Sequence, residues 1–270
     1  MIRPGVWLLR AVPPILILLL LTTGCTTTPT EETPTYIVGV NGDYPPYSYY
    51  DTNGELTGFD VEIIKQIAET EGINIRFKQI NWINTIPSLV NGDIDIYASH
   101  LVITPDRKKF VAFSKPYGTV DQAIAVKNNT TFTYDQFLSG EMSIAVQGTT
   151  INSEWVKAAL GKDLYNSMAN DGRILLYDTF PQSMIAVSLG LADCAVFDDG
   201  DVLYYIRNME TQQDKDLRIL TTVDTNEQYG IAVRQDENQL LGKINSGLEK
   251  IMNSENWTRL AEKYQVVGIE

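Results

Sequence analysis

The chain has 270 residues, of which 44% are hydrophobic and 20% are charged, and its formal net charge is −13 at pH 7. This acidic balance argues against nucleic acid as a partner, because phosphate groups are bound by a basic stripe. The chain has one histidine, His100, and two cysteines, Cys25 and Cys194. These counts argue against a multi-histidine metal site and a Ser–His catalytic pair, and we expect no metal and no cofactor.

The N-terminus has the pattern of a secretory signal peptide, which we predict over residues 1–24. Arg3 and Arg10 give a basic start, residues 11–21 form an apolar run, and a small residue precedes Cys25. The apolar run is too short to span a bilayer, which needs about 20 residues. Removal of this segment deletes two basic residues and no acidic one, so the formal charge changes from −13 to −15.

Cys25 directly follows Gly24 and resembles the lipid-attachment cysteine of secreted lipoproteins. The alternative is a signal peptide without lipidation and an incidental cysteine. Residues 25–35 are rich in Thr, Pro and Glu, a composition typical of a tether, which favours a lipid anchor on the extracytoplasmic face of the membrane. Cys194 then has no disulfide partner, and its apolar neighbours predict a buried small side chain.

From Tyr36 onward, short apolar strands alternate with amphipathic helices, which predicts an α/β fold with mainly parallel sheets and helices on their faces. We expect strands at 36–40, 73–77, 94–98, 122–126, 144–146, 194–197 and 229–233. We expect helices at about 60–71, 83–91, 151–160, 180–189, 201–209, 240–251 and 257–264. The mature chain is long enough for two modest domains or one large one.

Several polar and aromatic residues fall at the carboxyl ends of the predicted strands, where ligands of open α/β sheets bind. Residues 41–44 follow the first strand, residues 99–107 follow the third, and residues 148–150 open a helix. Asp198 follows a later strand, and Trp82 precedes the second helix. One cleft between two lobes would gather them all.

The order of these motifs resembles that of the extracellular amino-acid-binding proteins of ABC importers, over residues 36–265. The segments that carry the resemblance are 38–47, 54–62, 103–107 with 113–117, 147–150, 192–198 and 257–264. The resemblance implies the two-lobed type II periplasmic binding-protein fold, with the ligand in the cleft between the lobes.

The resemblance also implies domain boundaries and a function. Lobe 1 comprises residues 36–118 plus 225–270, and lobe 2 comprises residues 119–224, with hinges near 116–120 and 222–226. The protein is expected to capture a free amino acid by lobe closure and to deliver it to the permease subunits of an ABC transporter. We expect a monomer and no enzymatic activity.

The resemblance implies a role for each of five matching residues. Arg107 matches the ligand of the α-carboxylate, and its guanidinium fork suits two oxygens. Asp198 matches the acceptor of the α-ammonium group. Thr150 offers a backbone N–H at a helix N-terminus and can also serve as a plain N-cap. Tyr44 and Trp82 match rings that sandwich the ligand side chain, although both can be core aromatics.

The remaining candidate residues depart from the family pattern or have two possible roles. Ser99 is expected to face the ammonium group. Val102 stands where the family usually has Ser or Thr, and His100 stands where a small residue is usual, so that it narrows the pocket or is simply structural. The adjacent Asp198 and Asp199 allow an exchange of roles between ammonium acceptor and helix cap.

The charge of the pocket bears on the class of amino acid. Asn41 stands where binders of basic amino acids tend to carry Asp, which favours a neutral polar ligand over Lys or Arg. Asp43 and Asp121 are nearby acids that could restore the charge, but we interpret both as solvated loop residues.

Two other functions are compatible with the same scaffold. The first is an enzyme of the cyclohexadienyl-dehydratase type, which needs a positioned general acid. Asp43 is the one candidate carboxylate for that role, and the presence of Arg107 and Asp198, a pair that suits an amino acid, argues against the enzyme. A ligand-binding subunit that docks on a separate sensor is the other alternative.

Overall fold

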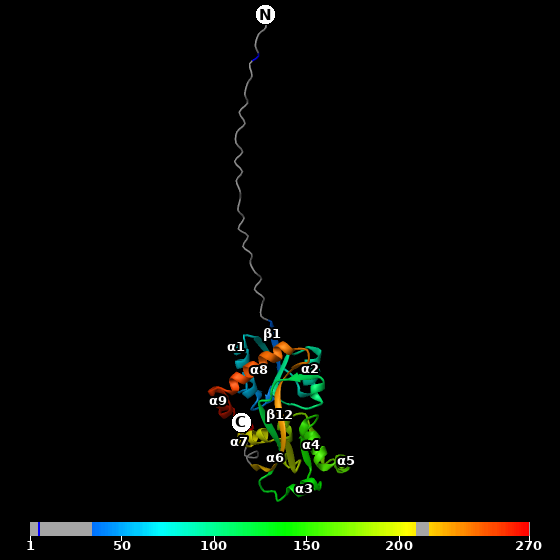
Figure 1. Ribbon diagram of the computed structural model, residues 1–270. Helices are drawn as coiled ribbons and strands as arrows, with labels where there is room; N and C mark the ends of the chain where they lie inside the picture. Colours follow the sequence, from blue (N-terminus) through cyan, green and yellow to red (C-terminus); the bar gives the residue numbers. More distant parts are fainter. Residues whose placement is uncertain (1–4, 6–33, 209–215, 270) are drawn as a thin grey trace. The chain divides into compact units, whose positions relative to one another are not determined.

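The computed structural model describes Gly5, residues 34–208 and residues 216–269 (Figure 1). Cys25 and, apart from Gly5, the predicted signal peptide lie outside the described residues. Within the described part of the chain, no helix combines the length and the apolar character needed to cross a membrane.

The predicted tether ends one residue too late. Thr35 is already the first residue of strand β1 (Thr35–Val40), where it pairs with Asn74 of β5 (Asn74–Gln79). The backbone of Thr35 belongs to the sheet because β1 and β5 are in parallel register along their full length.

The elements up to Phe113 and the two C-terminal helices build one half of the fold, which we call lobe 1. They are β1, β2 (Asp43–Tyr44), β3 (Ser48–Tyr50), β4 (Leu56–Thr57), α1 (Phe59–Glu71), β5, η1 (Trp82–Asn84), α2 (Thr85–Asn91), β6 (Ile96–Val102), η2 (Arg107–Lys109), β7 (Val111–Phe113), α8 (Asn238–Met252) and α9 (Glu255–Tyr264). Helix α1 shows why the pattern predicts well: Ile63, Ile64 and Ile67 are buried on one face, and Gly72 ends the helix in the left-handed conformation.

The middle of the chain builds the other half, lobe 2. Its elements are β8 (Gly118–Lys127), α3 (Tyr134–Leu138), β9 (Ile144–Gln147), α4 (Ile151–Leu160), α5 (Lys162–Asn170), β10 (Ile174–Tyr177), α6 (Phe180–Leu189), β11 (Cys194–Asp198) and α7 (Asp199–Asn208). Strand β12 (Leu217–Arg234) runs through both lobes. In Figure 1, α1, α2, α8 and α9 surround the upper end of β12, and α3, α4, α5 and α6 surround its lower end.

Several predicted boundaries were wrong: the strand expected at 122–126, for example, already begins at Gly118. Helix α7 begins at Asp199 and not at Asp201, because both acids fit a first helical turn, whose free N–H groups favour negative charge. The predicted end of this helix at Met209 lies outside the described residues. Strand β6 begins at Ile96 and not at Ile94 and continues to Val102, while the strand predicted at 229–233 is only the end of β12.

One nine-stranded sheet unites both lobes, in the order β10-β9-β11-β8-β12-β6-β1-β5, with β7 also paired to β12. The pairs β1–β5, β1–β6, β9–β10 and β9–β11 are parallel, which confirms the predicted parallel core of each lobe. Strands β8 and β12 are antiparallel to their neighbours and join the two parallel cores. A separate three-stranded sheet holds β2, β3 and β4.

The hydrophobic core divides in the same way. One large cluster packs α1, α8 and α9 against the lobe 1 strands, with Phe59, Ile67 and Leu248 fully buried. Two other clusters lie in lobe 2, around Met184 and around Phe137. Cys194 is completely buried in the latter, as predicted, and burial raises the pKa of its thiol.

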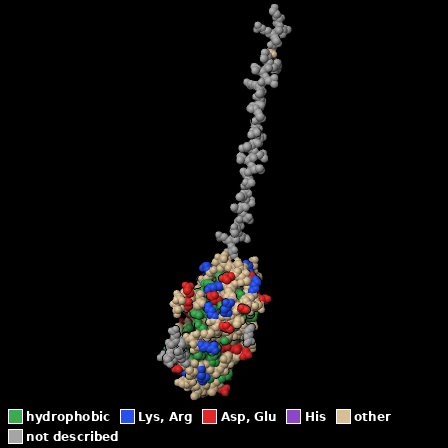
Figure 2. Space-filling view, turned by 90° about the vertical axis from the view of Figure 1, so that its left-hand side faces the viewer, with side chains coloured by type: hydrophobic (Ala, Val, Ile, Leu, Met, Phe, Trp, Pro, Cys, Tyr) green, Lys and Arg blue, Asp and Glu red, His purple; other side chains and the backbone are tan. Residues whose placement is uncertain are grey.

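The surface carries both signs of charge. On the face drawn in Figure 2, Lys and Arg side chains are interspersed with Asp and Glu side chains. The net acidity of the chain is therefore not gathered there into a single patch.

Candidate functional site

All nine residues predicted to bind the ligand line one cavity, whose empty space is about 380 Å³ including the part open to solvent. These residues are Asn41, Tyr44, Trp82, Ser99, His100, Val102, Arg107, Thr150 and Asp198. Five further lining residues were not predicted from the sequence: Tyr97, Gln147, Ile151, Asn152 and Phe197. The lining comes from β2, β6, η1, η2 and the loop residue Asn41 of lobe 1 on one side and from β9, α4 and β11 of lobe 2 on the other.

Arg107 presents the basic end of the cavity. It opens the short helix η2, its Nη1 donates to the carbonyl of Val102 at 2.6 Å, and its backbone N–H donates to the Thr104 hydroxyl at 3.1 Å. The guanidinium carbon lies 5.1 Å from the centre of the Trp82 ring. Burial lowers the pKa of Arg107, but a guanidinium stays charged at neutral pH. None of the ion pairs formed by the described residues involves Arg107, so its charge is available to an anion.

Thr150 stands at the start of α4 on the opposite wall. Its hydroxyl accepts from the backbone N–H of Ser153 at 3.2 Å and donates to the carbonyl of Gln147 at 2.8 Å, so the predicted N-cap role is present. Across the cavity, the Trp82 indole N–H donates to the carbonyl of Thr149 at 3.1 Å, which joins lobe 1 to lobe 2. This hydrogen bond is thus a direct contact between the lobes at a residue that lines the cavity.

Asp198 presents the acidic end. It is the last residue of β11, is 3% exposed, and accepts from the side-chain amide of Asn152 at 2.6 Å. Burial raises the pKa of Asp198 to about 7, against the opposing effect of the Asn152 hydrogen bond. Asp199 begins α7, accepts from the backbone N–H of Asp121 at 3.3 Å and does not line the cavity. Of the two adjacent acids, Asp198 is therefore the one that faces the cavity.

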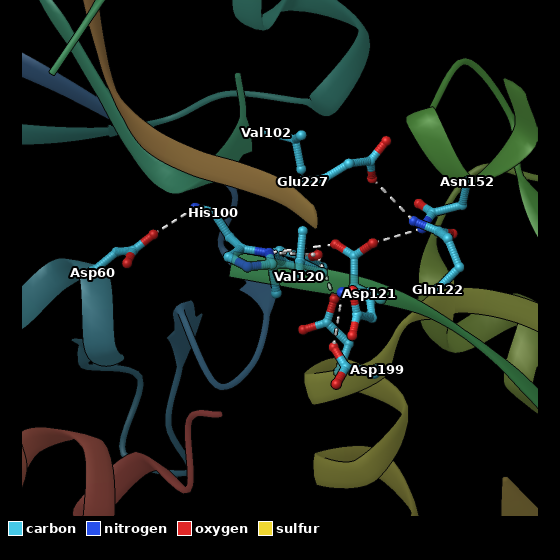
Figure 3. A network of polar contacts seen from close by, with 12 residues as sticks. Asp60, His100, Val102, Val120, Asp121, Gln122, Asn152, Asp199 and Glu227 are labelled. Atoms are coloured by element: carbon cyan, nitrogen blue, oxygen red, sulfur yellow. Dashed lines mark hydrogen bonds and ion pairs between the residues drawn. The ribbon is translucent and has the colours of Figure 1, made fainter. Parts of the chain in front are cut away.

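A hydrogen-bond network supports Asp198 from the strands that join the lobes. Asn152 also donates to Gln122 Oε1 at 2.9 Å, and Gln122 donates in turn to Glu227 at 3.3 Å (Figure 3). Gln122 lies on β8 and Glu227 on β12. The orientation of Asp198 is thus coupled to both connecting strands.

Ser99 and Asn41 are fixed by a small cluster of hydroxyl groups. The backbone N–H of Asn41 donates to the Ser99 hydroxyl at 3.3 Å, and the Ser48 hydroxyl donates to the Asn41 carbonyl at 2.6 Å. The two serine hydroxyl groups are 2.5 Å apart. The side chain of Asn41 lines the cavity, and its Oδ1 accepts from the backbone N–H of Asp43 at 3.3 Å.

His100 adopts a left-handed backbone conformation, with φ 49°, and is 3% exposed. Its ring stacks on Tyr47 with centroids 3.8 Å apart, and its backbone N–H donates to Asp60 at 2.5 Å (Figure 3). Burial lowers the pKa of His100 to about 3, so its imidazole is neutral and the 3.5 Å contact between Nδ1 and Asp198 is not an ion pair. This packing supports both roles predicted for His100: the residue narrows the cavity, and it has a structural function.

The acids Asp43 and Asp121 do not line the cavity. Asp43 is exposed, as the solvated interpretation expects. Asp121 is not a loop residue: it lies on β8, is partly buried, and accepts from the backbone N–H of Thr225 at 3.0 Å. That interpretation was wrong for Asp121 because its carboxylate bridges the two connecting strands.

Sequence reasoning missed Asp201, which is completely buried in α7 and accepts from the Tyr44 hydroxyl at 2.5 Å. The sequence carried no usable signal for this residue, because Asp198 ends β11 and the spacing of three residues to Asp201 therefore does not place both side chains on one helix face. Atoms of His100, Asp198 and Asp201 lie within 4.8 Å of one another, close enough to share a cation. The oxygens that face Tyr44 and Asn152 already accept hydrogen bonds, however, so the cluster is a hydrogen-bonded arrangement.

The fold and the cavity define the class of two-lobed solute-binding proteins. The chain belongs to the bacterial extracellular solute-binding proteins, family 3, whose model matches residues 36–267. This confirms the predicted family and fold.

Named relatives agree with the class. The "Probable histidine-binding protein" of Neisseria gonorrhoeae is 29% identical over 230 residues, which cover 85% of this chain and 82% of the relative. A solved ancestral arginine-binding protein bound to arginine is 31% identical, with a TM-score of 0.74, over 85% of this chain and 97% of that one. An ancestral amino acid-binding protein described as a precursor of cyclohexadienyl dehydratase is 29% identical, with a TM-score of 0.71, over 85% and 94% of the two chains.

Proposed function

We propose that this protein captures a free α-amino acid in the cavity by closure of its two lobes and delivers it to the permease subunits of an ABC transporter. One observation carries the proposal: Arg107 of lobe 1 and Asp198 of lobe 2 line the same cavity. An α-amino acid offers one carboxylate for the guanidinium and one ammonium group for the carboxylate. A ligand held by both residues favours the closed state, because only that state provides both contacts.

We infer a neutral polar side chain for the ligand. Asp198 is the one acid among the described residues that line the cavity, and the ammonium group uses it. No second carboxylate of that lining is left for a cationic side chain, and a buried unpaired charge is costly. Asn41, Gln147 and Asn152 can instead exchange hydrogen bonds with an amide or hydroxyl group.

The lobe boundaries that we propose are 36–118 plus 225–270 for lobe 1 and 119–224 for lobe 2. The pairing of β12 with β8 shifts its register between Val223 and Glu227, and Asn226 has φ 52°. Such an irregularity bends a strand, which supports a hinge near 222–226. We propose the other hinge at 116–120, around the start of β8 at Gly118.

We propose that Cys25 carries a lipid after removal of residues 1–24, and that the protein is a monomer on the extracytoplasmic face of the membrane. Cys25→Ala is expected to move the protein from the membrane fraction to the soluble fraction. The control Cys194→Ala changes a buried thiol of the folded part and should leave the protein with the membrane.

The direct test of the function is a thermal-shift screen of the wild-type protein against the common L-amino acids, followed by calorimetry of each hit. Ligand at about 100 times its Kd stabilises the folded state by about 2.7 kcal/mol, which is readily measured. We expect a neutral polar amino acid to give the largest shift and Arg or Lys a smaller one. A screen without any hit would contradict the proposal.

We propose no catalytic role, although one structural relative is described as a precursor of a dehydratase. Asp198 is the acid in the lining, and its position beside Asn152 suits an ammonium group. The bound amino acid should be recovered unchanged by mass spectrometry after prolonged incubation with the protein. Conversion of the ligand would favour the enzyme instead.

A further inference from the structure

A second set of contacts between the lobes lies behind the cavity. The Tyr44 hydroxyl contacts Asp201 Oδ2 at 2.5 Å and lies 3.4 Å from His100 Nδ1, which is itself 3.5 Å from Asp198 Oδ2. Tyr44 and His100 belong to lobe 1, and the two acids belong to lobe 2. We call these four residues the interlobe cluster, and its cross-lobe contacts depend on the lobes being closed.

The interlobe cluster holds two carboxyl groups and no cation. Its histidine is neutral, because burial lowers the pKa of His100 to about 3. The titratable groups that face it from the neighbouring elements are Tyr47, Asp60, Arg107, Asp199, Glu227 and Tyr229. Arg107 is the one cation among them, and it acts on Asp198 across the cavity. Two adjacent buried carboxyls without a bound cation do not both ionise.

Asp201 is the carboxyl suited to hold the proton. It is completely buried, its Oδ1 has no hydrogen-bond partner among the described residues, and burial beside Asp198 raises the pKa of Asp201 well above its ordinary value. Asp198 instead lines the cavity, where a ligand ammonium group would keep it ionised. In the closed, ligand-bound protein, Asp201 is therefore suited to be protonated and Asp198 to be ionised.

The conformation of His100 fixes the lobe 1 side of the cluster. Its left-handed backbone is unfavourable for a residue with a side chain, and such strain collects at functional positions. Its ring is held between Tyr47, stacked at 3.8 Å, and Tyr229, edge-on at 4.1 Å. The Nδ1 edge is thereby held toward the acids of lobe 2.

We propose that Asp201 is a positioning residue for ligand capture, which becomes protonated when the lobes close and then holds Tyr44 against the cavity. This inference rests on the proposed function. The carboxylate of Asp201 takes its proton from solvent, and an O–H bond forms as the lobes exclude water. One proton is thus bound for each ligand captured, so affinity should rise as the pH falls.

The test is calorimetry of the wild-type protein with the best amino acid from the screen, between about pH 5.5 and 8, in buffers that differ in ionisation enthalpy. We expect uptake of about one proton per ligand and an affinity that tightens about tenfold per pH unit lowered. Asp201→Asn keeps a neutral partner for Tyr44 and should abolish the proton uptake and flatten the pH profile. Asp163→Asn, an exposed position on α5, makes the same charge change and should keep the wild-type profile.

Tyr44→Phe separates positioning from protonation: it should lose affinity several-fold and keep the pH profile, because Asp201 is still buried on closure. Binding by the wild type without proton uptake, or an Asp201→Asn profile equal to that of wild type, would overturn the inference and leave the proposed function intact. Binding that requires added Zn²⁺ and is abolished by EDTA would also overturn it, since the cluster would then hold a cation. The wild-type proton count needs no variant, so the test does not depend on the folding of Asp201→Asn.

Discussion

The two ends of the cavity differ in how their charge is maintained. At one end, Arg107 is partly exposed on the short helix η2 and keeps its charge at any physiological pH. At the other end, Asp198 is 3% exposed and its pKa is raised to about 7 by burial. Recognition of the ligand carboxylate should therefore be independent of pH, whereas recognition of the ammonium group should depend on protonation and on closure.

The largest effect on ligand binding is expected from the loss of the permanent charge of Arg107. Arg107→Ala should weaken amino-acid binding by about 2–5 kcal/mol, because a partly desolvated carboxylate loses its charged partner. Arg107→Lys should recover only part of this loss, since an ammonium group lacks the planar fork. Calorimetry at about pH 7 measures both variants.

The matched control for this prediction is Arg259→Ala, which removes an exposed arginine on α9. It should leave the affinity unchanged. An Arg107→Ala variant that binds the amino acid as tightly as wild type would show that Arg107 does not bind the ligand. The cavity would then have no permanently charged end to set against Asp198.

Behind the cavity, Asp60 is a buried carboxyl of lobe 1 that accepts from the backbone N–H of His100, so its burial does not depend on closure of the lobes. Burial raises the pKa of Asp60 from 3.8 to about 7, so the folded ligand-free state holds a proton that the unfolded state releases. The stabilisation is fully present below about pH 4 and is lost as the pH rises through about 7, at about 1.4 kcal/mol per pH unit. Urea unfolding between about pH 5 and 7 measures this loss.

Asp60→Asn should remove this pH dependence and raise the stability of the ligand-free protein at about pH 7. Asp163→Asn should do neither, because its carboxyl is exposed. A ligand-free protein whose stability increases from pH 5 to 7 would contradict the burial of uncompensated carboxyls.

A smaller effect is expected at His100. His100→Gly and His100→Ala both remove the imidazole, but only Gly adopts φ 49° without strain. The glycine variant should therefore be more stable than the alanine variant by about 1–2 kcal/mol in the free energy of unfolding. Equal stabilities would show that the backbone at this position is relaxed.

The smallest effect is expected at Val102, which lines the cavity and is 3% exposed. Val102→Thr supplies a hydroxyl group to the α-groups of the ligand and should tighten binding by at most about 1 kcal/mol. Val126→Thr makes the same change at a buried position away from the cavity and should not tighten binding. A loss of affinity specific to Val102→Thr would indicate that the ligand places an apolar group there.

Local patterns predicted much of the fold. The helix expected at 180–189 has those bounds, because its apolar residues are periodic and Gly190 ends it. Each predicted ligand residue lies on one cavity, because the loops at the carboxyl ends of parallel strands meet at one edge.

The features that were missed depend on distant contacts. The first two thirds of β12 carry no apolar alternation and form a strand because they pair with β8. Asp201 is a site neighbour only because the closed lobes bring Tyr44 against α7. No pattern local to either segment specifies such pairings.

The central claim is that a zwitterion is held between Arg107 and Asp198, and one set of titrations tests it most directly. The amino acid found in the screen is compared with its deaminated and its decarboxylated analogue, on wild type, Arg107→Ala and Asp198→Asn. Each analogue should bind wild type at least tenfold more weakly, which corresponds to about 1.4 kcal/mol. Loss of the ammonium group should add little to the effect of Asp198→Asn, and loss of the carboxylate little to that of Arg107→Ala. Analogues that bind wild type as well as the amino acid does would contradict the account.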